Sequence, residues 1–325
     1  MKNREKVLVT GATGFVGRSL CQALIKEGYA VRACIRSYTQ SKQLRENVSD
    51  PSLLSFYICP ALETFNAWHL LLKDMDYIIH LAARVHVIND NSTEPLKAFR
   101  AVNVDVTKRL VEAAALTNIK RFIFMSSIKI HGEINAVPFV ETSSANPEDP
   151  YAISKWEAEK VIQEVGKRTG LDFVIIRPPL VYGKQARANF QQLIHWIKKG
   201  YPLPLGNIQN QRSFIYIDNL IYGIINVLKA PVAKQQTYLI DDGKAVSTTE
   251  LIESISKALG KSVKLFSLPK PLIFFLGKIL GQKSKLEKLM GSLVINSNKL
   301  QNDLNWKPPY NLVDALTKEF SEEVI

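Results

Sequence analysis

The feature that most constrains the fold is an alternation, through the first 179 residues, of short apolar runs with longer amphipathic stretches. Strands that are apolar throughout are typical of a parallel sheet covered on both faces by the intervening helices. The pattern therefore predicts a doubly wound α/β architecture. The expected strands are 6–10, 30–35, 54–59, 77–83, 121–127 and 173–179, and the expected helices are 15–27, 94–117 and 150–168.

Beyond residue 179 this regular pattern loosens. Loops and short strands separate the expected helices, and the segments YPLPLGN and LPKPL are typical of loops. We expect residues 1–178 to form a Rossmann domain, with a return segment near 214–242, and 179–325 to form mainly a smaller mixed α/β substrate lobe. The helices expected in this lobe lie near 187–199, 218–229, 248–259 and 269–280.

Composition places the chain among globular proteins, with 46% hydrophobic and 22% charged residues in 325. Cys21, Cys34 and Cys59 form no CxxC pair, so we expect no disulfide framework and a reducing, cytoplasmic location. No apolar run follows the basic MKNREK start, and no span of about 18 apolar residues occurs, so neither a signal peptide nor a transmembrane helix is expected.

The net charge of +12 is spread along the chain and is densest between Lys261 and Lys288. Nucleic-acid binders usually gather such charge into a patch interleaved with aromatic residues. We therefore interpret most of it as a solvated basic surface, and we expect no nucleic-acid partner.

The first expected strand leads directly into the segment GATGFVG, with Gly11, Gly14 and Gly17. Glycine is needed where such a turn is tight, where backbone approaches a pyrophosphate and where the helix packs on the strand. The N–H groups at the start of the next helix would then hold the phosphates. A glycine triplet alone is weak evidence, but in this strand-to-helix context it predicts a dinucleotide site.

The second expected strand, AVRACIRS, has no acid at its end, where NAD sites usually place one to bind the ribose 2′-hydroxyl. Arg36 stands there instead, with Arg32 nearby. A guanidinium suits a 2′-phosphate, so the cofactor is NAD or NADP, with NADP slightly favoured. The alternative is that Arg36 simply points into water.

The segment YAISKWEAEK begins an expected helix and places Tyr151 and Lys155 four residues apart, on one helical face. A lysine cation close to a tyrosine lowers the pKa of the phenol, which can then exchange a proton with a substrate hydroxyl. Such a spacing is common by chance. The fifth expected strand adds specificity, because it ends in Ser126 and Ser127 at the edge of the sheet where ligands bind.

His80, His86 and His131 are not spaced as metal ligands and have no acid cluster beside them, so no metal site is expected.

Taken together, these motifs resemble the extended short-chain dehydrogenase/reductase family, of the NAD-dependent epimerase/dehydratase type, over nearly the whole chain. The resemblance is closest to bacterial UDP-sugar 4-epimerases and UDP-4-keto-sugar reductases. It implies that Ser127, Tyr151 and Lys155 are catalytic. It also implies cofactor contacts from Gly11, Thr13, Gly14, Phe15, Val16, Gly17, Arg36, Leu81, Ala82, Ala83, Asn103, Tyr151, Lys155 and Pro178.

The same resemblance implies a UDP-sugar substrate bound by Ser127, Asn189 and Arg212, the last pairing with the diphosphate. Two segments depart from the family pattern. CPALE stands where the family often has Gly-Asp near the adenine, and Lys184-Gln185 stands where a Pro-Gly pair is frequent. Only the adenine contact is put in doubt.

Three reactions are weighed. A 4,6-dehydratase of this family carries an acid just after the strand-five Ser/Thr, and because Ile128 and Lys129 stand there, dehydration is rejected. A 4-epimerase acting on UDP-glucose or UDP-N-acetylglucosamine, in surface-polysaccharide precursor synthesis, is the first expectation. The alternative is an NAD(P)H-dependent UDP-4-keto-6-deoxy-hexosamine 4-reductase, toward which Arg36 leans. A more remote alternative is a non-catalytic, NADP-sensing binding protein.

The resemblance also implies a homodimer, in which helices 94–117 and 150–168 of two subunits form a four-helix bundle. The stretch LIFFLGKIL (272–280), beside several lysines, could touch a membrane surface. We interpret it instead as a core-facing helix of the small lobe, and stable membrane association is not expected.

Overall fold

The computed structural model describes residues 4–85, 94–183, 186, 189–269, 271–273 and 283–321. The side chains of residues 189, 283–285 and 288 lie outside this description.

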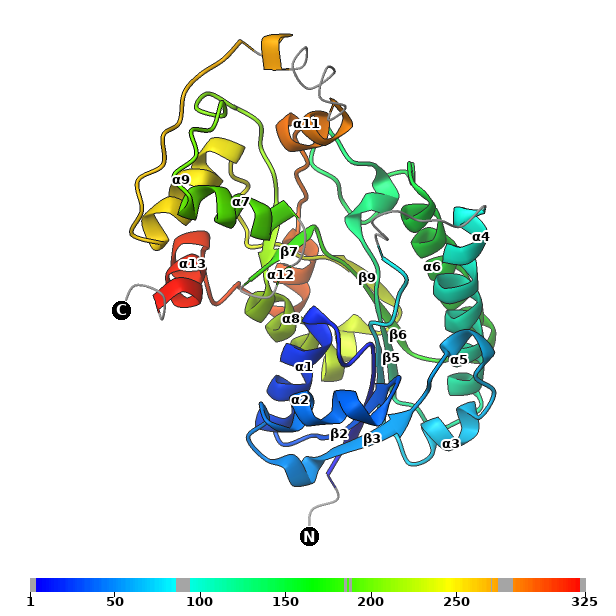
Figure 1. Cartoon of the computed structure of the whole chain (residues 1–325). Helices are drawn as coiled ribbons and strands as arrows, with labels where there is room; N and C mark the ends of the chain where they lie inside the picture. Colours follow the sequence, from blue (N-terminus) through cyan, green and yellow to red (C-terminus); the bar gives the residue numbers. More distant parts are fainter. Residues whose placement is uncertain are drawn as a thin grey trace.

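A seven-stranded sheet forms the centre of the molecule, with all strands parallel and in the order β3-β2-β1-β4-β5-β6-β9 (Figure 1). The direction of the strand order reverses between β1 and β4, so the carboxyl ends of these two strands form the switch point where ligands of such sheets bind. The doubly wound fold predicted from the sequence is confirmed. The strands are β1 (Lys6–Thr10), β2 (Ala30–Ile35), β3 (Leu54–Ile58), β4 (Tyr77–His80), β5 (Arg121–Met125), β6 (Phe173–Arg177) and β9 (Gln236–Leu239).

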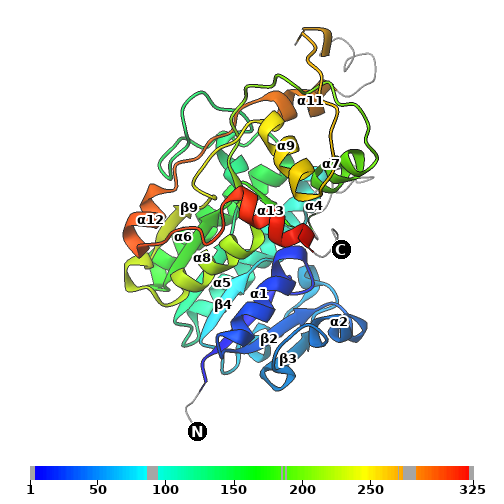
Figure 2. The same ribbon diagram turned by 90° about the vertical axis from the view of Figure 1, so that its left-hand side faces the viewer.

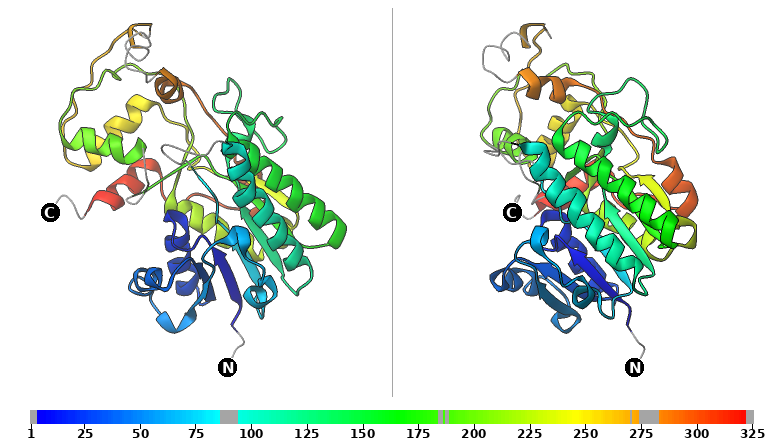
Figure 3. Two further views of the ribbon diagram at one scale, coloured as in Figure 1. Left: turned by 45° about the vertical axis from the view of Figure 1, so that its right-hand side comes forward. Right: turned by 90° about the vertical axis from the view of Figure 1, so that its right-hand side faces the viewer.

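Helices cover both faces of the sheet, and the alternation of side chains along β1 shows which cluster each face joins. Val7 and Val9 lie in the core cluster that includes α1 (Phe15–Lys26) and α8 (Ile217–Lys229). Leu8 points the other way, into the cluster with α3 (Trp68–Leu72), α5 (Val106–Ala115) and α6 (Pro150–Thr169). Figure 2 shows the first face and Figure 3 the second, where α5 and α6 lie side by side.

Several strands end earlier than the sequence pattern predicted. β4 stops at His80 because its partner β1 ends at Thr10, directly before the glycine turn, and the register pairs these two residues. β5 stops at Met125 and β6 at Arg177. Residues 81–83, 126–127 and 178 therefore lie in loops beyond the carboxyl edge of the sheet, where they can face a ligand.

The single helix expected at 94–117 is divided into three parts. α4 (Pro95–Arg100) and α5 flank a turn of π-helix at Ala101–Asp105. Single π turns inside α-helices are frequent at functional sites, and this one carries Asn103.

The smaller lobe lies beyond the carboxyl edge of the sheet, at the opposite end of the molecule from the N terminus (Figure 1). Its two-stranded parallel sheet pairs β7 (Leu180–Tyr182) with β8 (Phe214–Tyr216), whereas β9 joins the large sheet beside β6. The expected helix near 269–280 is helical at 271–273, and residues 274–280 lie outside the described residues. The helices of this part are α7 (Asn189–Lys198), α9 (Thr248–Ala258), α11 (Lys283–Met290) and α13 (Leu312–Phe320), whereas α12 (Asn298–Leu304) packs beside β9 at the edge of the large sheet (Figure 2).

Shorter helical turns connect these elements: α2 (Ser41–Arg45) and 3₁₀ turns at Tyr38–Gln40, Pro51–Leu53, Leu62–Thr64, Ile128–His131 and Pro231–Ala233. None of the helices in the described part of the chain is both long and apolar enough to cross a bilayer.

Candidate active site

The turn after β1 requires glycine at two positions for different reasons. Gly11 has φ +69°, and a Cβ there would lie 2.8 Å from the backbone nitrogen of Ala82. A Cβ on Gly17 would lie 2.2 Å from the carbonyl oxygen of Gly11. The first glycine thus allows the left-handed turn against the end of β4, and the third lets α1 pack directly on that turn.

The N terminus of α1 is built to receive an anion. α1 has 12 residues, and its N-cap, Gly14, contributes no side-chain hydrogen bond. The N–H groups of the first turn, at Phe15, Val16 and Gly17, therefore lack a capping side chain, and the helix has no acid in that turn. These residues fit the diphosphate of a dinucleotide.

Two arginines of β2 and its end differ in what they contact. The Arg32 guanidinium is already hydrogen-bonded within the protein, because its Nη1 donates to the carbonyl oxygens of Leu71 at 2.8 Å and Lys73 at 3.0 Å. Arg36 is exposed, and its backbone N–H donates to Gln40. Of the two residues considered for a 2′-phosphate, only Arg36 stays a candidate.

A chain of buried polar groups runs beneath the glycine turn. Thr10 Oγ1 lies 2.6 Å from His80 Nδ1, and His80 Nε2 lies 2.9 Å from Thr107 Oγ1. The Thr107 hydroxyl donates to the carbonyl oxygen of Asn103, so its remaining role is to accept from His80, which fixes the Nε2–H tautomer. Burial lowers the pKa of His80 to about 3, so this ring is neutral and structural.

Asn103 connects this chain to the helix that carries the tyrosine. Its side chain accepts from the N–H of Arg84 at 2.7 Å, donates to the Arg84 carbonyl at 3.0 Å and donates to Ser154 Oγ at 2.9 Å. Ser154 in turn donates to the carbonyl oxygen of Tyr151 at 2.7 Å. The π turn therefore positions the loop after β4 and the first turn of α6 relative to each other.

Ser127 and Tyr151 come together above the carboxyl ends of β5 and β6. The Ser127 hydroxyl lies near enough to the Tyr151 phenol to lower its pKa, and the Tyr151 ring packs edge-on against Phe99, with the ring centres 6.3 Å apart. Ser126, one residue earlier, has a buried hydroxyl with no hydrogen-bond partner. An orphaned buried hydroxyl next to Ser127 is what a site for a polar ligand presents.

The electrostatics of Tyr151 differ from the sequence-based expectation. Burial, and then the Asp149 carboxylate, raise the pKa of Tyr151 to about 12, although the hydrogen bond from Ser127 opposes them. Lys155 is buried, with its Nζ 3.9 Å from the centre of the Phe124 ring, and burial lowers its pKa to about 7. The expected lowering of the phenol pKa is therefore wrong for the protein as described, because burial raises the pKa of the phenol and also lowers the pKa of the lysine that was expected to oppose this rise.

An ion-pair cluster that the sequence did not reveal lies beside this pair. Lys129 Nζ contacts Glu133 Oε1 at 2.6 Å and Asp149 Oδ2 at 3.1 Å. Asp149 is also the N-cap of α6 and accepts from the N–H of Ala152 at 2.7 Å. Lys129 thus links the loop after Ser127 to the start of the helix that carries Tyr151, and it offsets the carboxylate that raises the phenol pKa.

Of the expected substrate residues, Ser127 follows β5 of the large sheet, whereas Asn189 and Arg212 lie in the small lobe. Arg212 is partly buried, donates from Nη1 to the carbonyl oxygen of Gly291 at 2.9 Å and feels the charge of Glu133. Asn189 begins α7, but its side chain lies outside the described residues, as do Lys184, Gln185 and His86. Among the described residues no group of histidines, cysteines and acids could hold a metal ion.

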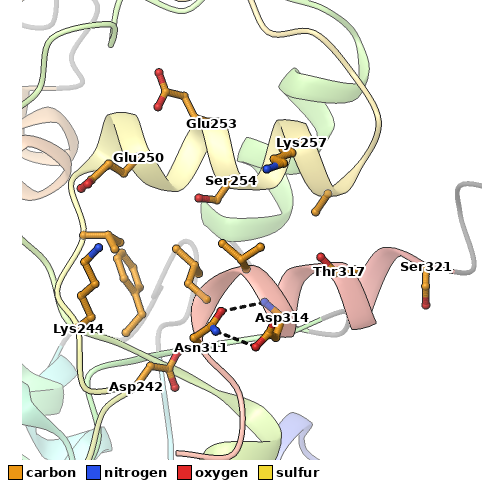
Figure 4. Close-up of a pocket in the computed structure, with 15 residues that line it drawn as sticks. Asp242, Lys244, Glu250, Glu253, Ser254, Lys257, Asn311, Asp314, Thr317 and Ser321 are labelled. Atoms are coloured by element: carbon orange, nitrogen blue, oxygen red, sulfur yellow. Dashed lines mark hydrogen bonds between the residues drawn. The ribbon is translucent and has the colours of Figure 1, made fainter.

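One well-defined cavity in the described part of the chain lies away from the expected site residues. Figure 4 shows it between α9 and α13, with a volume of about 1000 Å³. Glu250, Glu253 and Lys257 of α9 and Asp314 of α13 line it, and none of the expected site residues does. The catalytic assignment therefore rests on the Ser127–Tyr151–Lys155 region and not on cavity size.

Known proteins share this organisation. The UDP-glucose 4-epimerase of Vibrio cholerae is 37% identical over 321 residues, which cover 97% of this chain and 94% of that protein. The UDP-2-acetamido-2,6-beta-L-arabino-hexul-4-ose reductase of Pseudomonas aeruginosa is 26% identical over 258 residues, covering 77% of this chain and 56% of that protein. The structure of the UDP-glucuronic acid 4-epimerase of Bacillus cereus, in complex with UDP-glucuronic acid and NAD, aligns at 25% identity and a TM-score of 0.79 over 98% of this chain and 100% of that chain.

A family model described as the NAD dependent epimerase/dehydratase family matches residues 7–241, from the first strand to the loop after β9. This match spans more than half of the chain and contains the glycine turn, Ser127, Tyr151 and Lys155. The chain therefore belongs to the NAD-dependent epimerase/dehydratase family of extended short-chain dehydrogenases/reductases.

Proposed function

We propose that the protein is a UDP-hexose 4-epimerase that acts on UDP-glucose or UDP-N-acetylglucosamine and supplies precursors for surface polysaccharide. The observation that carries the proposal is the proximity of the Ser127 hydroxyl to the Tyr151 phenol, with buried Lys155 one helical turn further along α6. The likeness to the Vibrio cholerae epimerase over almost the whole chain supports the choice of reaction.

The residues of the pair would divide the proton chemistry between them. Tyr151 would take the proton from the C4 hydroxyl when that carbon is oxidised, and return it when the ketone is reduced from the other face. Ser127, whose hydroxyl lies near the Tyr151 phenol, would hold the reacting oxygen in line with the phenol. A Tyr151 pKa of about 12 suits the acid role, whereas the base role requires positive charge beside the phenol.

Lys155 is the residue that can supply this charge. Its pKa of about 7 means that a small change in its surroundings decides whether it is an ammonium ion near neutral pH. An anionic or hydroxyl-rich ligand placed beside it would favour the charged form, which would lower the pKa of the phenol. We propose that Lys155 couples occupation of the site to the protonation of Tyr151.

The cofactor would be held by the glycine turn and the start of α1, at Gly11, Thr13, Gly14, Phe15, Val16 and Gly17, by Leu81, Ala82 and Ala83, and by Asn103, Tyr151, Lys155 and Pro178. When bound there, a nicotinamide dinucleotide accepts and returns the hydride. Arg36 at the end of β2 favours NADP slightly. Asn189 and Arg212 would bind the diphosphate of the UDP-sugar.

The second candidate is a 4-reductase of UDP-4-keto-6-deoxy-hexosamines. The exposed guanidinium of Arg36 favours it, because NADPH is the usual reducing pool. The likeness to the Pseudomonas aeruginosa hexul-4-ose reductase is consistent with this chemistry. The same Ser127, Tyr151 and Lys155 would serve a single reduction.

One experiment separates the two candidates. The purified protein is mixed with UDP-glucose, and separately with UDP-N-acetylglucosamine, without added cofactor, and the C4 epimers are quantified by chromatography. An epimerase that retains its cofactor forms the equilibrium mixture from either side. If no epimer forms, even with NAD added, whereas a 4-keto sugar consumes NADPH, the epimerase proposal is wrong. The nucleotide released on denaturation, identified by mass, distinguishes NAD from NADP.

We also propose a homodimer through α4, α5 and α6. Salt bridges between Arg100 and Glu157, at 2.6 Å, and between Arg168 and Glu112 already align these helices within one subunit. Light scattering after size exclusion tests this proposal, and a monomer at micromolar concentration would contradict it.

A further inference from the structure

The positive charge of this protein is concentrated in two segments of the small lobe. Residues 184–217 contain five Lys and Arg, residues 254–286 contain seven, and neither segment contains an Asp or Glu. These 12 cations equal the formal net charge of the whole chain, so the rest of the chain has as many acids as bases. The excess positive charge therefore lies in these two segments, although lysines occur along the whole sequence.

The structure brings the described parts of the two segments side by side around Leu203 and Leu265. The N–H of Leu203 donates to the carbonyl oxygen of Lys264 at 2.9 Å, and the N–H of Phe266 donates to the carbonyl oxygen of Leu203 at 3.1 Å. The N–H of Tyr201 reaches back to the carbonyl oxygen of Trp196 at 3.2 Å, so the end of α7 belongs to the same region. Two stretches about 60 residues apart in sequence thus lie next to each other in the small lobe.

This part of the small lobe combines exposed aromatic rings with lysines. Trp196 is 36% exposed, Tyr201 52% and Phe266 43%, although aromatic rings of this size are usually more deeply buried. Lys199, Lys261 and Lys264 are also exposed. We call these six residues, Trp196, Lys199, Tyr201, Lys261, Lys264 and Phe266, the basic aromatic face.

We propose that the basic aromatic face docks the protein reversibly on an anionic phospholipid bilayer. Lysines attract acidic headgroups, and tryptophan and tyrosine partition to the level of the headgroups. A reversible electrostatic contact of this kind needs no membrane-spanning segment. It goes beyond the proposed reaction and does not depend on it, since no residue of this face belongs to the catalytic or substrate site.

The composition of the face favours a bilayer over a nucleic acid. Its cations are all lysines, whereas base and phosphate recognition in nucleic acids relies strongly on the fork of arginine. Binding to a nucleic acid is therefore an outcome that the test must be able to reveal.

Flotation with vesicles tests the proposal on the full-length protein. Vesicles of phosphatidylcholine with about one-third phosphatidylglycerol are compared with pure phosphatidylcholine, at low and at high salt. We expect binding only to the anionic vesicles, with loss at high salt because the contact is electrostatic.

Two sets of charge reversals locate the contact. The triple variant Lys199→Glu, Lys261→Glu, Lys264→Glu should bind the anionic vesicles at least about tenfold more weakly. A matched triple variant of exposed lysines elsewhere on the molecule, Lys26→Glu, Lys73→Glu, Lys234→Glu, changes the net charge equally and should bind as the natural protein does. Melting temperatures and enzymatic activity in solution, measured for both variants, verify that they are folded.

The role of the rings is tested separately by Tyr201→Ser with Phe266→Ser, which keeps all charges. This variant should bind several-fold more weakly and lose its contact at lower salt. Absence of binding to anionic vesicles at low salt would overturn the proposal. Equal weakening by both lysine variants would show that binding depends on net charge and not on the basic aromatic face, and would overturn the proposal. Tighter binding to a DNA duplex than to vesicles would overturn it in favour of a nucleic-acid partner.

Discussion

The region beneath the glycine turn and the small lobe use polar residues in opposite ways. Beneath the turn, Thr10, His80, Thr107 and Asn103 are buried and bonded to one another in a single continuous chain. In the small lobe, the lysines and aromatic rings of the basic aromatic face are exposed.

The difference shows where rigidity is needed. A polar group buried without a partner costs about 1–3 kcal/mol, so the buried chain is strongly specified and holds the tyrosine relative to the cofactor site. The exposed face has no such constraint and can serve binding. Changes in the first region should therefore reduce rate or stability, whereas changes in the second should reduce affinity.

The largest expected effect is that of Tyr151→Phe. Removing the hydroxyl that exchanges the proton should lower kcat by about 10²–10⁴-fold, with the melting temperature nearly unchanged. Steady-state kinetics with UDP-glucose and a thermal melt measure the two quantities. If the variant kept most of its activity, the first region would not set the rate, and the hypothesis of a non-catalytic binding protein would again have to be considered.

Asn103→Ala tests whether the buried chain sets stability. It removes three hydrogen bonds and leaves groups of Arg84 and Ser154 without these partners, so the free energy of unfolding should fall by about 3 kcal/mol. The control is Asn47→Ala, because Asn47 is exposed and makes one bond, to the Gln43 carbonyl. Chemical denaturation of both variants compares them, and equal stabilities would mean that the π turn does not position α6.

Lys155→Met tests the cost of the buried lysine through its pH dependence. The folded pKa is about 7 and the ordinary value is 10.5, so the unfolded state binds more protons between these pH values and stability rises with pH across the window. For the natural protein the contribution of this residue should add about 2 kcal/mol to the free energy of unfolding between pH 7 and about pH 9.

The Lys155→Met variant should lack this rise, whereas Lys160→Met should keep it, because Lys160 is exposed on the same helix. Denaturant unfolding at several pH values measures the slopes. Parallel pH curves for the natural protein and Lys155→Met would show that burial does not lower the pKa of this lysine.

The smallest expected effect is that of a substitution in the small lobe. Arg212→Ala should raise KM for the UDP-sugar by about tenfold with a much smaller change in kcat, because a diphosphate contact serves ground state and transition state alike. Lys199→Ala, a change on the basic aromatic face, should alter neither constant in solution. A fall in kcat without a change in KM would place Arg212 in the chemistry rather than in binding.

Much of the first region follows from local sequence. The strands around β1 are recognisable because each is apolar throughout. The turn is recognisable because its glycines lie between a strand and a helix, and the structure shows that no side chain fits at Gly11 or Gly17. The predicted ends of β4, β5 and β6 lay two or three residues too far along the chain. A strand ends where its neighbour in the sheet ends, and the pairing of Thr10 with His80 is a long-range contact that local sequence does not show.

Other features have no local signal at all. The π turn around Asn103 reads as ordinary helix in the sequence, and the Lys129–Asp149 pair joins residues that only the docking of α6 brings together. The pKa of Tyr151 was predicted in the wrong direction because four-residue spacing shows proximity but not burial.

By itself the sequence determined the doubly wound sheet, the glycine turn and the residue types available for catalysis, because periodicity and backbone conformation are local properties. Only the tertiary structure decided which polar groups are buried, how charged Lys155 is near neutral pH, and that two acid-free segments lie next to each other. These properties depend on desolvation and on distances between residues far apart in the chain, and both are set by packing.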